Sequence, residues 1–114
     1  MEVINRTTNG MLAYCAKCRS YHLEYGNFFF QFTEKEMEGF KDYLDKVNGE
    51  YYELLNRDTP NSRKIFLRLP IQCVYFALYL NELYELRTLV HCFEENTSTS
   101  TCIHHTEAGT FCMN

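Results

Sequence analysis

A short aromatic hairpin at residues 20–32 constrains the fold more than any other feature of the sequence. The pair Gly26-Asn27 separates two runs rich in Tyr and Phe, a strong signal for a two-residue β-turn. This turn predicts three pairs on one face of the sheet: Tyr25 with Phe28, Leu23 with Phe30, and Tyr21 with Phe32. The other face then carries His22 opposite Gln31 and Glu24 opposite Phe29. Because turn chemistry and alternation select the same register, the aromatic face is expected to line the core.

Further strands are expected on both sides of this hairpin. Residues 11–15 predict a preceding strand that turns back at Ala16-Lys17. A tight turn there would place Cys15 opposite Cys18 and Leu12 opposite Tyr21. Later in the chain, residues 64–69 and 72–80 predict a second strand pair around a corner at Pro70.

Two amphipathic helices follow these strand pairs. Thr33 and Glu36 form a capping box before the apolar stripe Met37, Phe40, Tyr43, Leu44 and Val47. Lys41 and Asp42 are expected on the solvent side. Tyr51, Leu54 and Leu55 continue the stripe, so this helix could run past Asn48-Gly49. Asn81 is expected to cap the second helix, whose stripe is Leu83, Leu86, Leu89, Val90 and Phe93.

These elements predict an α+β fold: an antiparallel sheet of about five strands with both helices on one face. The hairpin turns are too short for the crossovers of a parallel sheet. A chain of 114 residues has room for one core. We therefore expect a single domain over residues 1–95 and a Ser/Thr-rich tail containing Cys and His over residues 96–114.

Charge and hydropathy exclude several classes of function. The net charge of −4 argues against a nucleic-acid binder. The longest uncharged stretch, residues 69–81, is shorter than the roughly 20 residues needed to cross a bilayer. The first residues show no signal-peptide pattern, which predicts a cytoplasmic protein without membrane contact. Six Cys in such a protein indicate thiols or metal ligands rather than disulfides.

Cys15-x-x-Cys18 is the one motif with a known chemistry. A tight hairpin turn can direct two thiolates at this spacing toward one zinc ion, as in a zinc knuckle. A thioredoxin-type redox pair needs its first Cys at a helix N-terminus, whereas this pair lies between strands. The sequence contains no second Cys-x-x-Cys. Cys15 and Cys18 are therefore predicted as half of a metal site.

Candidates for the other ligands lie in the tail: Cys102, His104, His105 and Cys112. His22 is closer in sequence, but an extended chain would place its Cα about 13 Å from that of Cys18. On that ground His22 is expected to be a sheet-surface residue. A thiol pair without metal is the alternative. Cys73 and Cys92 are expected to be packing residues.

The sequence shows no catalytic spacing of Ser, His and Asp and no glycine-rich phosphate loop, which disfavours an enzyme. The leading interpretation is a non-catalytic module that binds zinc or an unknown protein partner. A thiol-redox protein using Cys15 and Cys18 is the first alternative. A structural homodimer with incidental cysteines is the second.

Self-association is expected on separate grounds. Helices on one face leave the other face of the sheet uncovered. That face would carry Phe29 and either Phe66 with Tyr75 and Tyr79 or their alternates. Exposed aromatic patches usually mark a contact surface, which predicts a two-fold homodimer. Cover by the tail or by residues 51–55 of the same chain is the alternative.

The order of these motifs resembles a known family. Cys-x-x-Cys, then His-Leu-Glu-Tyr-Gly-Asn-Phe, an acidic amphipathic helix and Arg-Lys-Ile-Phe-Leu-Arg-Leu-Pro resemble small uncharacterised bacterial proteins of unknown function. The resemblance covers about residues 11–92, with Cys15 and Cys18 matching that family's paired cysteines. It implies a bacterial cytoplasmic domain and brings no activity with it.

Overall fold

The computed structural model of the chain describes residues 1–93. The elements in order are β1 (Glu2–Thr7), β2 (Gly10–Cys15), β3 (Ser20–Tyr25), β4 (Phe28–Phe32), α1 (Glu34–Lys46), α2 (Gly49–Leu55), β5 (Ile65–Arg68), β6 (Tyr75–Leu78) and α3 (Leu80–His91). They form two compact units: Met1–Lys46 with the chain from Glu85, and Val47–Tyr84. The predicted α+β class is confirmed. The strands form a four-stranded and a two-stranded sheet, however, instead of one sheet of about five strands.

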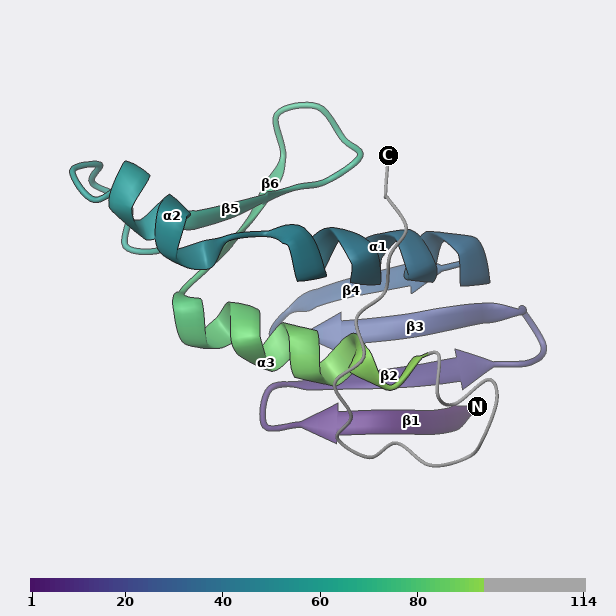
Figure 1. The fold of residues 1–114 in the computed structure, drawn as a ribbon. Coiled ribbons are helices and arrows are strands. Elements are labelled where there is room, and N and C mark those ends of the chain that lie inside the picture. Colours follow the sequence, from purple (N-terminus) through teal and green to yellow (C-terminus); the bar gives the residue numbers. More distant parts are fainter. Residues whose placement is uncertain (94–114) are drawn as a thin grey trace. The chain divides into compact units, whose positions relative to one another are not determined.

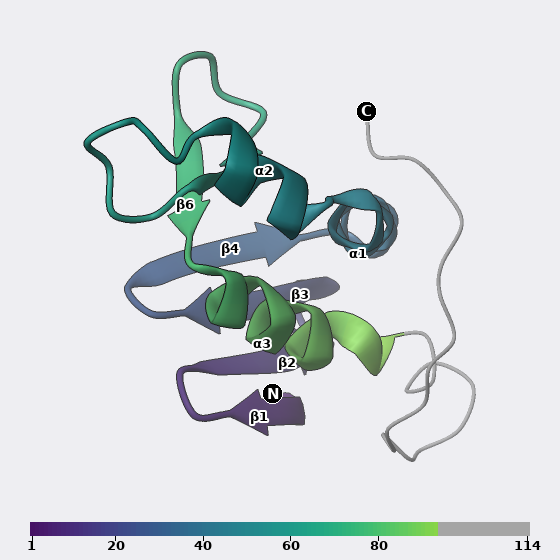
Figure 2. The ribbon, with the colours of Figure 1, turned by 60° about the vertical axis from the view of Figure 1, so that its left-hand side comes forward.

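The first unit is an antiparallel sheet of order β1-β2-β3-β4 with helices on one face (Figure 1). Figure 2 shows α1 and α3 on the same side of this sheet. The Phe40 ring of α1 lies 5.2 Å from that of Phe32 and 5.8 Å from that of Phe30, on β4. The last turns of α3 reach β2, where Leu89 lies so close to Gly10 that a Cβ there would clash. The core of this unit lies between these helices and the sheet.

The predicted hairpin register is confirmed at all five pairs, from Tyr21 with Phe32 to Tyr25 with Phe28. Leu23 on the helix-covered face is fully buried, whereas Glu24 and Phe29 on the outer face are exposed. Gly26 has a φ of 61°, the left-handed conformation that a two-residue hairpin turn requires. The turn geometry and the pattern of burial therefore support the same register for this hairpin.

The turn between β2 and β3 differs from the prediction. It contains four residues, Ala16–Arg19, and places Cys15 opposite Ser20 and Leu12 opposite Leu23. Arg19 closes the turn in the left-handed region at φ 54°, which sequence pattern did not indicate for an Arg. Because the register moves by two residues, each side chain stays on its predicted face.

Strand β1 was not predicted, and Asn5 within it and Asn9 in the turn after it both hydrogen-bond to helix α3. The register of β1 shifts between Val3 and Asn5, and after this bulge Asn5 Nδ2 donates to the carbonyl oxygens of Thr88 and Leu89, at 3.1 and 3.3 Å. These carbonyls belong to the last turns of α3, which lack helical donors. In the turn after β1, Asn9 donates its backbone N–H and its Nδ2 to the Glu85 carboxylate, at 2.8 and 2.9 Å.

Helix α1 begins with the predicted capping box. Thr33 N–H donates to Glu36 Oε1 at 2.9 Å, and Glu36 N–H donates to Thr33 Oγ1 at 3.1 Å. The expectation that Lys41 and Asp42 face solvent is wrong, since both side chains are buried. Each has an opposite charge one helical turn later, Asp45 at 3.7 Å and Lys46 at 3.1 Å respectively.

The second unit begins with a separate helix, so one helix does not run past Asn48-Gly49. Asn48 has extended backbone and caps α2 by accepting the Tyr51 N–H on Oδ1 at 3.0 Å. Gly49 is needed for packing, because an added Cβ would lie 2.6 Å from Leu80 and 2.9 Å from Leu83. The β5–β6 pair follows, with Pro70 within its connection.

Helix α3 begins one residue before Asn81, so that the predicted cap is wrong. Tyr79 N–H donates to Glu82 Oε1 at 2.8 Å, which is half of a capping box with Tyr79 in the cap position. Arg63 binds the Glu82 carboxylate through two nitrogens and stacks 4.3 Å from the centre of the Tyr79 ring. The predicted apolar stripe is buried: Leu83, Leu86, Leu89, Val90 and Phe93.

Candidate metal site at the turn between β2 and β3

Three potential metal ligands converge where β2 turns into β3. The Sγ atoms of Cys15 and Cys18 and a ring nitrogen of His22 all lie within 4.8 Å of one another. Cys18 Sγ is 2.7 Å from Cys15 Sγ and 3.9 Å from His22 Nε2. Two thiols and one imidazole are the ligand types that bind zinc and other thiophilic metals. This group could therefore hold a metal ion.

The local backbone explains why these three side chains meet. Cys15 is the last residue of β2 and pairs with Ser20, so that His22 is its diagonal neighbour across the ladder. Cys15 and His22 share the outer face of the sheet, away from the helices. The four-residue turn, closed by Arg19, then brings Cys18 back over that face. A two-residue turn would have left Cys18 and His22 on one extended strand, with their Cα atoms about 13 Å apart.

The distance argument against His22 was wrong for an identifiable reason. It assumed an extended chain between Cys18 and His22, but β3 begins at Ser20 and the turn residues before it reverse direction. A signal was nevertheless present, because alternation places Cys15 and His22 on the same face of the sheet. The distance between these candidate ligands therefore depends on the pairing of β2 with β3 and not on their separation along a single strand.

Hydrogen bonds at the turn favour the ionised form of Cys15. The Cys18 thiol and the Cys18 backbone N–H, at 3.4 Å, both donate to Cys15 Sγ. These two bonds lower the pKa of the Cys15 thiol below its usual value, the Cys18 side chain contributing most. Thiolates and not thiols are the metal ligands, so this environment promotes metal binding.

The site is open to solvent and has neighbours that fix the His22 strand. Cys18 is exposed, while Cys15 and His22 are half-buried. The His22 ring packs edge-on against Phe29, with centroids 5.3 Å apart. Gln31 Nε2 donates to Ser20 Oγ at 3.2 Å beside it. A metal ion bound here would lie on the surface of the sheet.

The other sequence-predicted ligands are Cys102, His104, His105 and Cys112, and all lie outside the described residues. Within residues 1–93, Cys15, Cys18 and His22 form the one group of three or more metal-type ligands found close together. Tetrahedral zinc is held by four ligands in structural sites, so these three leave one position to be filled.

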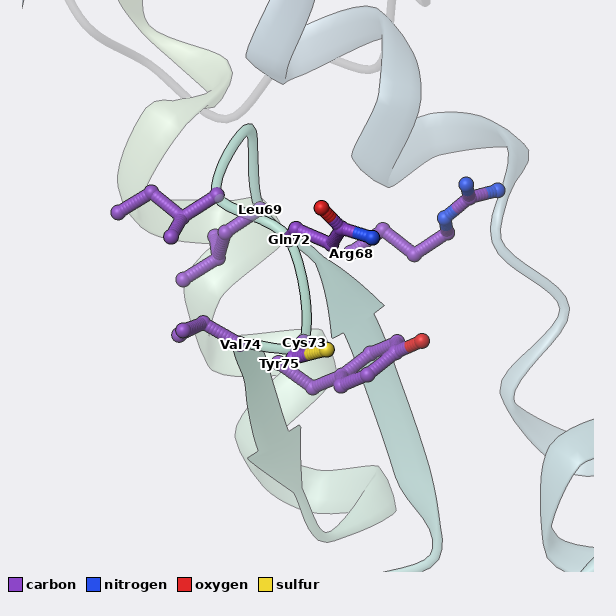
Figure 3. Close-up of a pocket in the computed structure, with 7 residues that line it drawn as sticks. Arg68, Leu69, Gln72, Cys73, Val74 and Tyr75 are labelled. Carbon is purple, nitrogen blue, oxygen red and sulfur yellow. The ribbon is translucent and has the colours of Figure 1, made fainter.

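The remaining cysteines of the described chain lie elsewhere. Cys92 is buried, as expected, but it is disulfide-bonded, so the expectation of thiols or metal ligands in place of disulfides is wrong for this residue. Cys73 is exposed in the connection between β5 and β6, with a φ of 68°, so its expected burial is wrong. It lines a shallow hollow together with Arg68, Leu69, Ile71, Gln72, Val74 and Tyr75 (Figure 3). No second metal-type ligand lines this hollow, which is therefore a poor metal site.

The aromatic residues expected in a dimer contact fall in both units. Phe29 is 57% exposed on the outer face of the four-stranded sheet. In the second unit, Tyr75 and Tyr79 are exposed at 53% and 40%, while Phe66 is half-buried against the Tyr75 ring. In the first unit, Val3 is 43% exposed on the same outer face as Phe29.

Comparison with known proteins places the chain in a family over residues 1–114. It belongs to DUF6686, a family of unknown function. The match is wider than residues 11–92 and includes the tail. No curated protein and no solved structure matches this member of DUF6686. None of the helices described for residues 1–93 is long and apolar enough to cross a membrane.

Proposed function

We propose that this member of DUF6686 is a non-catalytic metal-binding module that holds one zinc ion through Cys15, Cys18 and His22. The observation that carries the proposal is the convergence of three ligand atoms within 4.8 Å at one turn. Zinc is favoured because two thiolates and an imidazole match its borderline-soft character. The proposal requires reduced thiols, and Cys15 and Cys18 are both free cysteines.

The distances indicate how the turn would change on binding zinc. Two thiolates on tetrahedral zinc, at bond lengths near 2.3 Å, are about 3.8 Å apart. The present separation of 2.7 Å would therefore increase by about 1 Å. Cys18 lies in an exposed turn and can make this movement, whereas Cys15 is held in β2. Such an ion would tie the turn to His22 on β3 and stabilise the sheet edge.

The proposed fourth ligand comes from the tail, where Cys102, His104, His105 and Cys112 offer the correct atom types. A site completed by the tail is closed and structural. Replacing all four tail residues together should then weaken zinc binding by at least about tenfold. Unchanged affinity in that variant would instead assign the fourth position to water.

Metal analysis of the reduced full chain tests the proposal. We expect one zinc per chain in the unmodified protein, and a loss of affinity of about 100-fold or more in Cys15→Ser and in His22→Ala. Cys73→Ser is the matched control, since it removes another exposed cysteine outside the group. Stoichiometric zinc that survives Cys15→Ser and His22→Ala together would overturn the assignment of these ligands.

We propose self-association through the outer face of the four-stranded sheet as a second role. The exposed side chains of Phe29 and Val3 on this face support it, since an uncovered antiparallel face is ordinarily polar. Sedimentation equilibrium at micromolar protein tests the proposal. A dimer that dissociates in Phe29→Glu is the expected result, and a strict monomer in the unmodified protein would contradict it.

A further inference from the structure

We infer that Cys15 and Cys18 form a reversible disulfide that competes with the metal ion for the same two sulfur atoms. This inference rests on the proposed metal site and assigns it a mode of regulation. The chemical partners are a hydroperoxide as oxidant and a low-molecular-weight thiol as reductant. Metal-bound and disulfide forms would then be mutually exclusive states of one turn.

The distance between the sulfurs is the first observation that supports this competition. At 2.7 Å, the Sγ atoms lie between the roughly 2.05 Å of a disulfide and the roughly 3.8 Å of two thiolates on zinc. The shift needed in either direction is about 1 Å or less. Cys15 is held at the end of β2, and Cys18 lies in the exposed turn, so Cys18 makes the movement. The same pair can therefore reach both arrangements without rearranging the sheet.

Access to solvent differs between the two sulfurs and sets the order of the chemistry. Cys18 is exposed together with its turn neighbours Ala16, Lys17 and Arg19, whereas Cys15 is half-buried at the strand end. A hydroperoxide therefore reaches Cys18 first.

The oxidation proceeds in two balanced steps. The Cys18 thiol first loses its proton to solvent; the thiolate then attacks one oxygen of hydrogen peroxide, the O–O bond breaks, and Cys18 sulfenic acid forms with release of hydroxide. The Cys15 thiolate then attacks the Cys18 sulfur, the S–O bond breaks, and a second hydroxide leaves. Both hydroxides take up protons to become water. The two sulfurs lose two electrons to the peroxide, and the neutral disulfide no longer holds the ion.

Reduction returns the site to its metal-binding form. A glutathione thiolate attacks one sulfur of the disulfide, the Cys15–Cys18 bond breaks and the other cysteine leaves as a thiolate; a second glutathione thiolate attacks the glutathione sulfur of this mixed disulfide and releases the second protein thiolate. The two electrons lost to peroxide are thereby restored, and glutathione disulfide is released. Cys15 and Cys18 then carry their negative charges again and can bind the ion.

The test begins with the zinc-loaded full chain, which is treated with hydrogen peroxide in the presence of a colorimetric zinc chelator. Trypsin cuts after Arg6, Lys17 and Arg19, which leaves residues 7–17 and 18–19 joined solely by a Cys15–Cys18 bond. We expect zinc release in parallel with this linked peptide pair, and reversal of both by glutathione. Zinc release without the linked pair would overturn the inference.

A second arm uses metal-free protein, so that failure of the disulfide and failure of the metal site are distinguishable. We expect the linked pair to form faster in metal-free than in zinc-loaded protein by about tenfold or more. Zinc that binds with one-to-one stoichiometry while peroxide produces no linked pair would overturn the inference and leave the proposed function intact. A linked pair whose formation zinc does not slow would overturn the competition.

Single variants test the order of attack. In Cys15→Ser, a sulfenic-acid probe such as dimedone should label Cys18, because no second thiolate is available to displace hydroxide. In Cys18→Ser, labelling of Cys15 should be at least about tenfold slower, since its sulfur is less exposed. Cys73→Ser should form the Cys15–Cys18 pair at the unmodified rate. Equal labelling rates in the two single variants would overturn the assigned order.

Discussion

The two ends of strand β3 contrast within one sheet. At its C-terminal end, Gly26 forms a two-residue turn and donates its N–H to the Asn9 carbonyl at 2.9 Å, while Tyr25 donates its hydroxyl to Glu85. We call these residues the locked end. At its N-terminal end, the four-residue turn carries Cys15 and Cys18, which hydrogen-bond to each other. We call this the cysteine end.

The difference shows how one strand serves two purposes. The locked end uses polar groups to hold two turns and helix α3 together. These polar groups are therefore engaged in hydrogen bonds that maintain the fold. The cysteine end leaves nucleophilic and metal-ligating atoms close together and accessible to solvent. Functional groups need such freedom, and loops positioned by a rigid scaffold commonly provide it. The locked end therefore supplies the rigidity on which the cysteine end depends.

The largest effect is expected in the centre of β3, which both ends share. Leu23→Ala should lower the free energy of unfolding by about 3–4 kcal/mol, because Leu23 is fully buried and its loss leaves a cavity. Glu24→Ala on the exposed face is the matched control and should change it by no more than about 0.5 kcal/mol. Urea denaturation measures both, and equal losses would contradict the assignment of the two faces.

The hydrogen bonds of the locked end depend on the charge of the Glu85 carboxylate. Burial alone would raise the pKa of its carboxyl, but hydrogen bonds led by those from Asn9 outweigh burial and lower the pKa from 4.5 to about 2. Because the folded-state pKa is lowered, the carboxylate stabilises the fold above pH 4.5. That contribution is lost as the pH falls from 4.5 toward 2.

Glu85→Gln should therefore lower the free energy of unfolding at pH 7 by about 1–2 kcal/mol, a figure that allows for screening by solvent. The variant should also lose less stability than the unmodified chain between pH 4.5 and 2. Denaturation at several pH values measures this difference. Parallel pH profiles for the two proteins would show that Glu85 does not hold the locked end.

The turn of the locked end depends on its glycine. Gly26→Ala should cost about 1 kcal/mol, because φ is 61° and an L side chain is disfavoured there. An added Cβ would meet no atom within 4 Å, so this cost is one of backbone conformation and not of collision. Asn27→Ala is the control and should cost less. Thermal denaturation of both variants provides the measurement.

The same backbone argument predicts a smaller effect in the other direction at the cysteine end. Arg19 occupies the left-handed region at φ 54° without being glycine. Arg19→Gly should therefore raise the free energy of unfolding by up to about 1 kcal/mol, less the added flexibility of the unfolded chain. A clear loss of stability would show that the Arg19 side chain contributes contacts that outweigh its backbone strain.

Sequence reasoning succeeded where two independent signals agreed. At the locked end, Gly26-Asn27 and the alternation of apolar residues gave the register of β3 and β4 in full. At the cysteine end, the sequence offered one weak indication of the length of the turn. A tight turn was predicted, whereas the structure has a four-residue turn that Arg19 closes. His22 was consequently excluded as a ligand, although Cys15 and Cys18 were selected correctly as neighbours.

Other differences arose from tertiary contacts that local patterns do not encode. Asp42 is buried because a charge one turn away accompanies it, and helical periodicity alone assigned it to solvent. The break after α1 depends on the Asn48 cap and on the close packing of Gly49. The separation of β5 and β6 from the larger sheet likewise had no signal in their apolar sequences.

Cobalt(II) titration of the reduced full chain tests the metal site most directly, because cobalt replaces zinc and its spectrum reports ligand type and geometry. We expect saturation at one equivalent, with sulfur-to-cobalt charge-transfer absorption and the intense visible bands of tetrahedral cobalt. Cys15→Ser and Cys18→Ser should each reduce the charge-transfer absorption, His22→Ala should weaken binding while both sulfurs remain ligands, and Cys73→Ser should match the unmodified chain. An unmodified chain that shows no charge-transfer absorption, or one that keeps its full intensity in Cys15→Ser, would contradict a metal site at this turn.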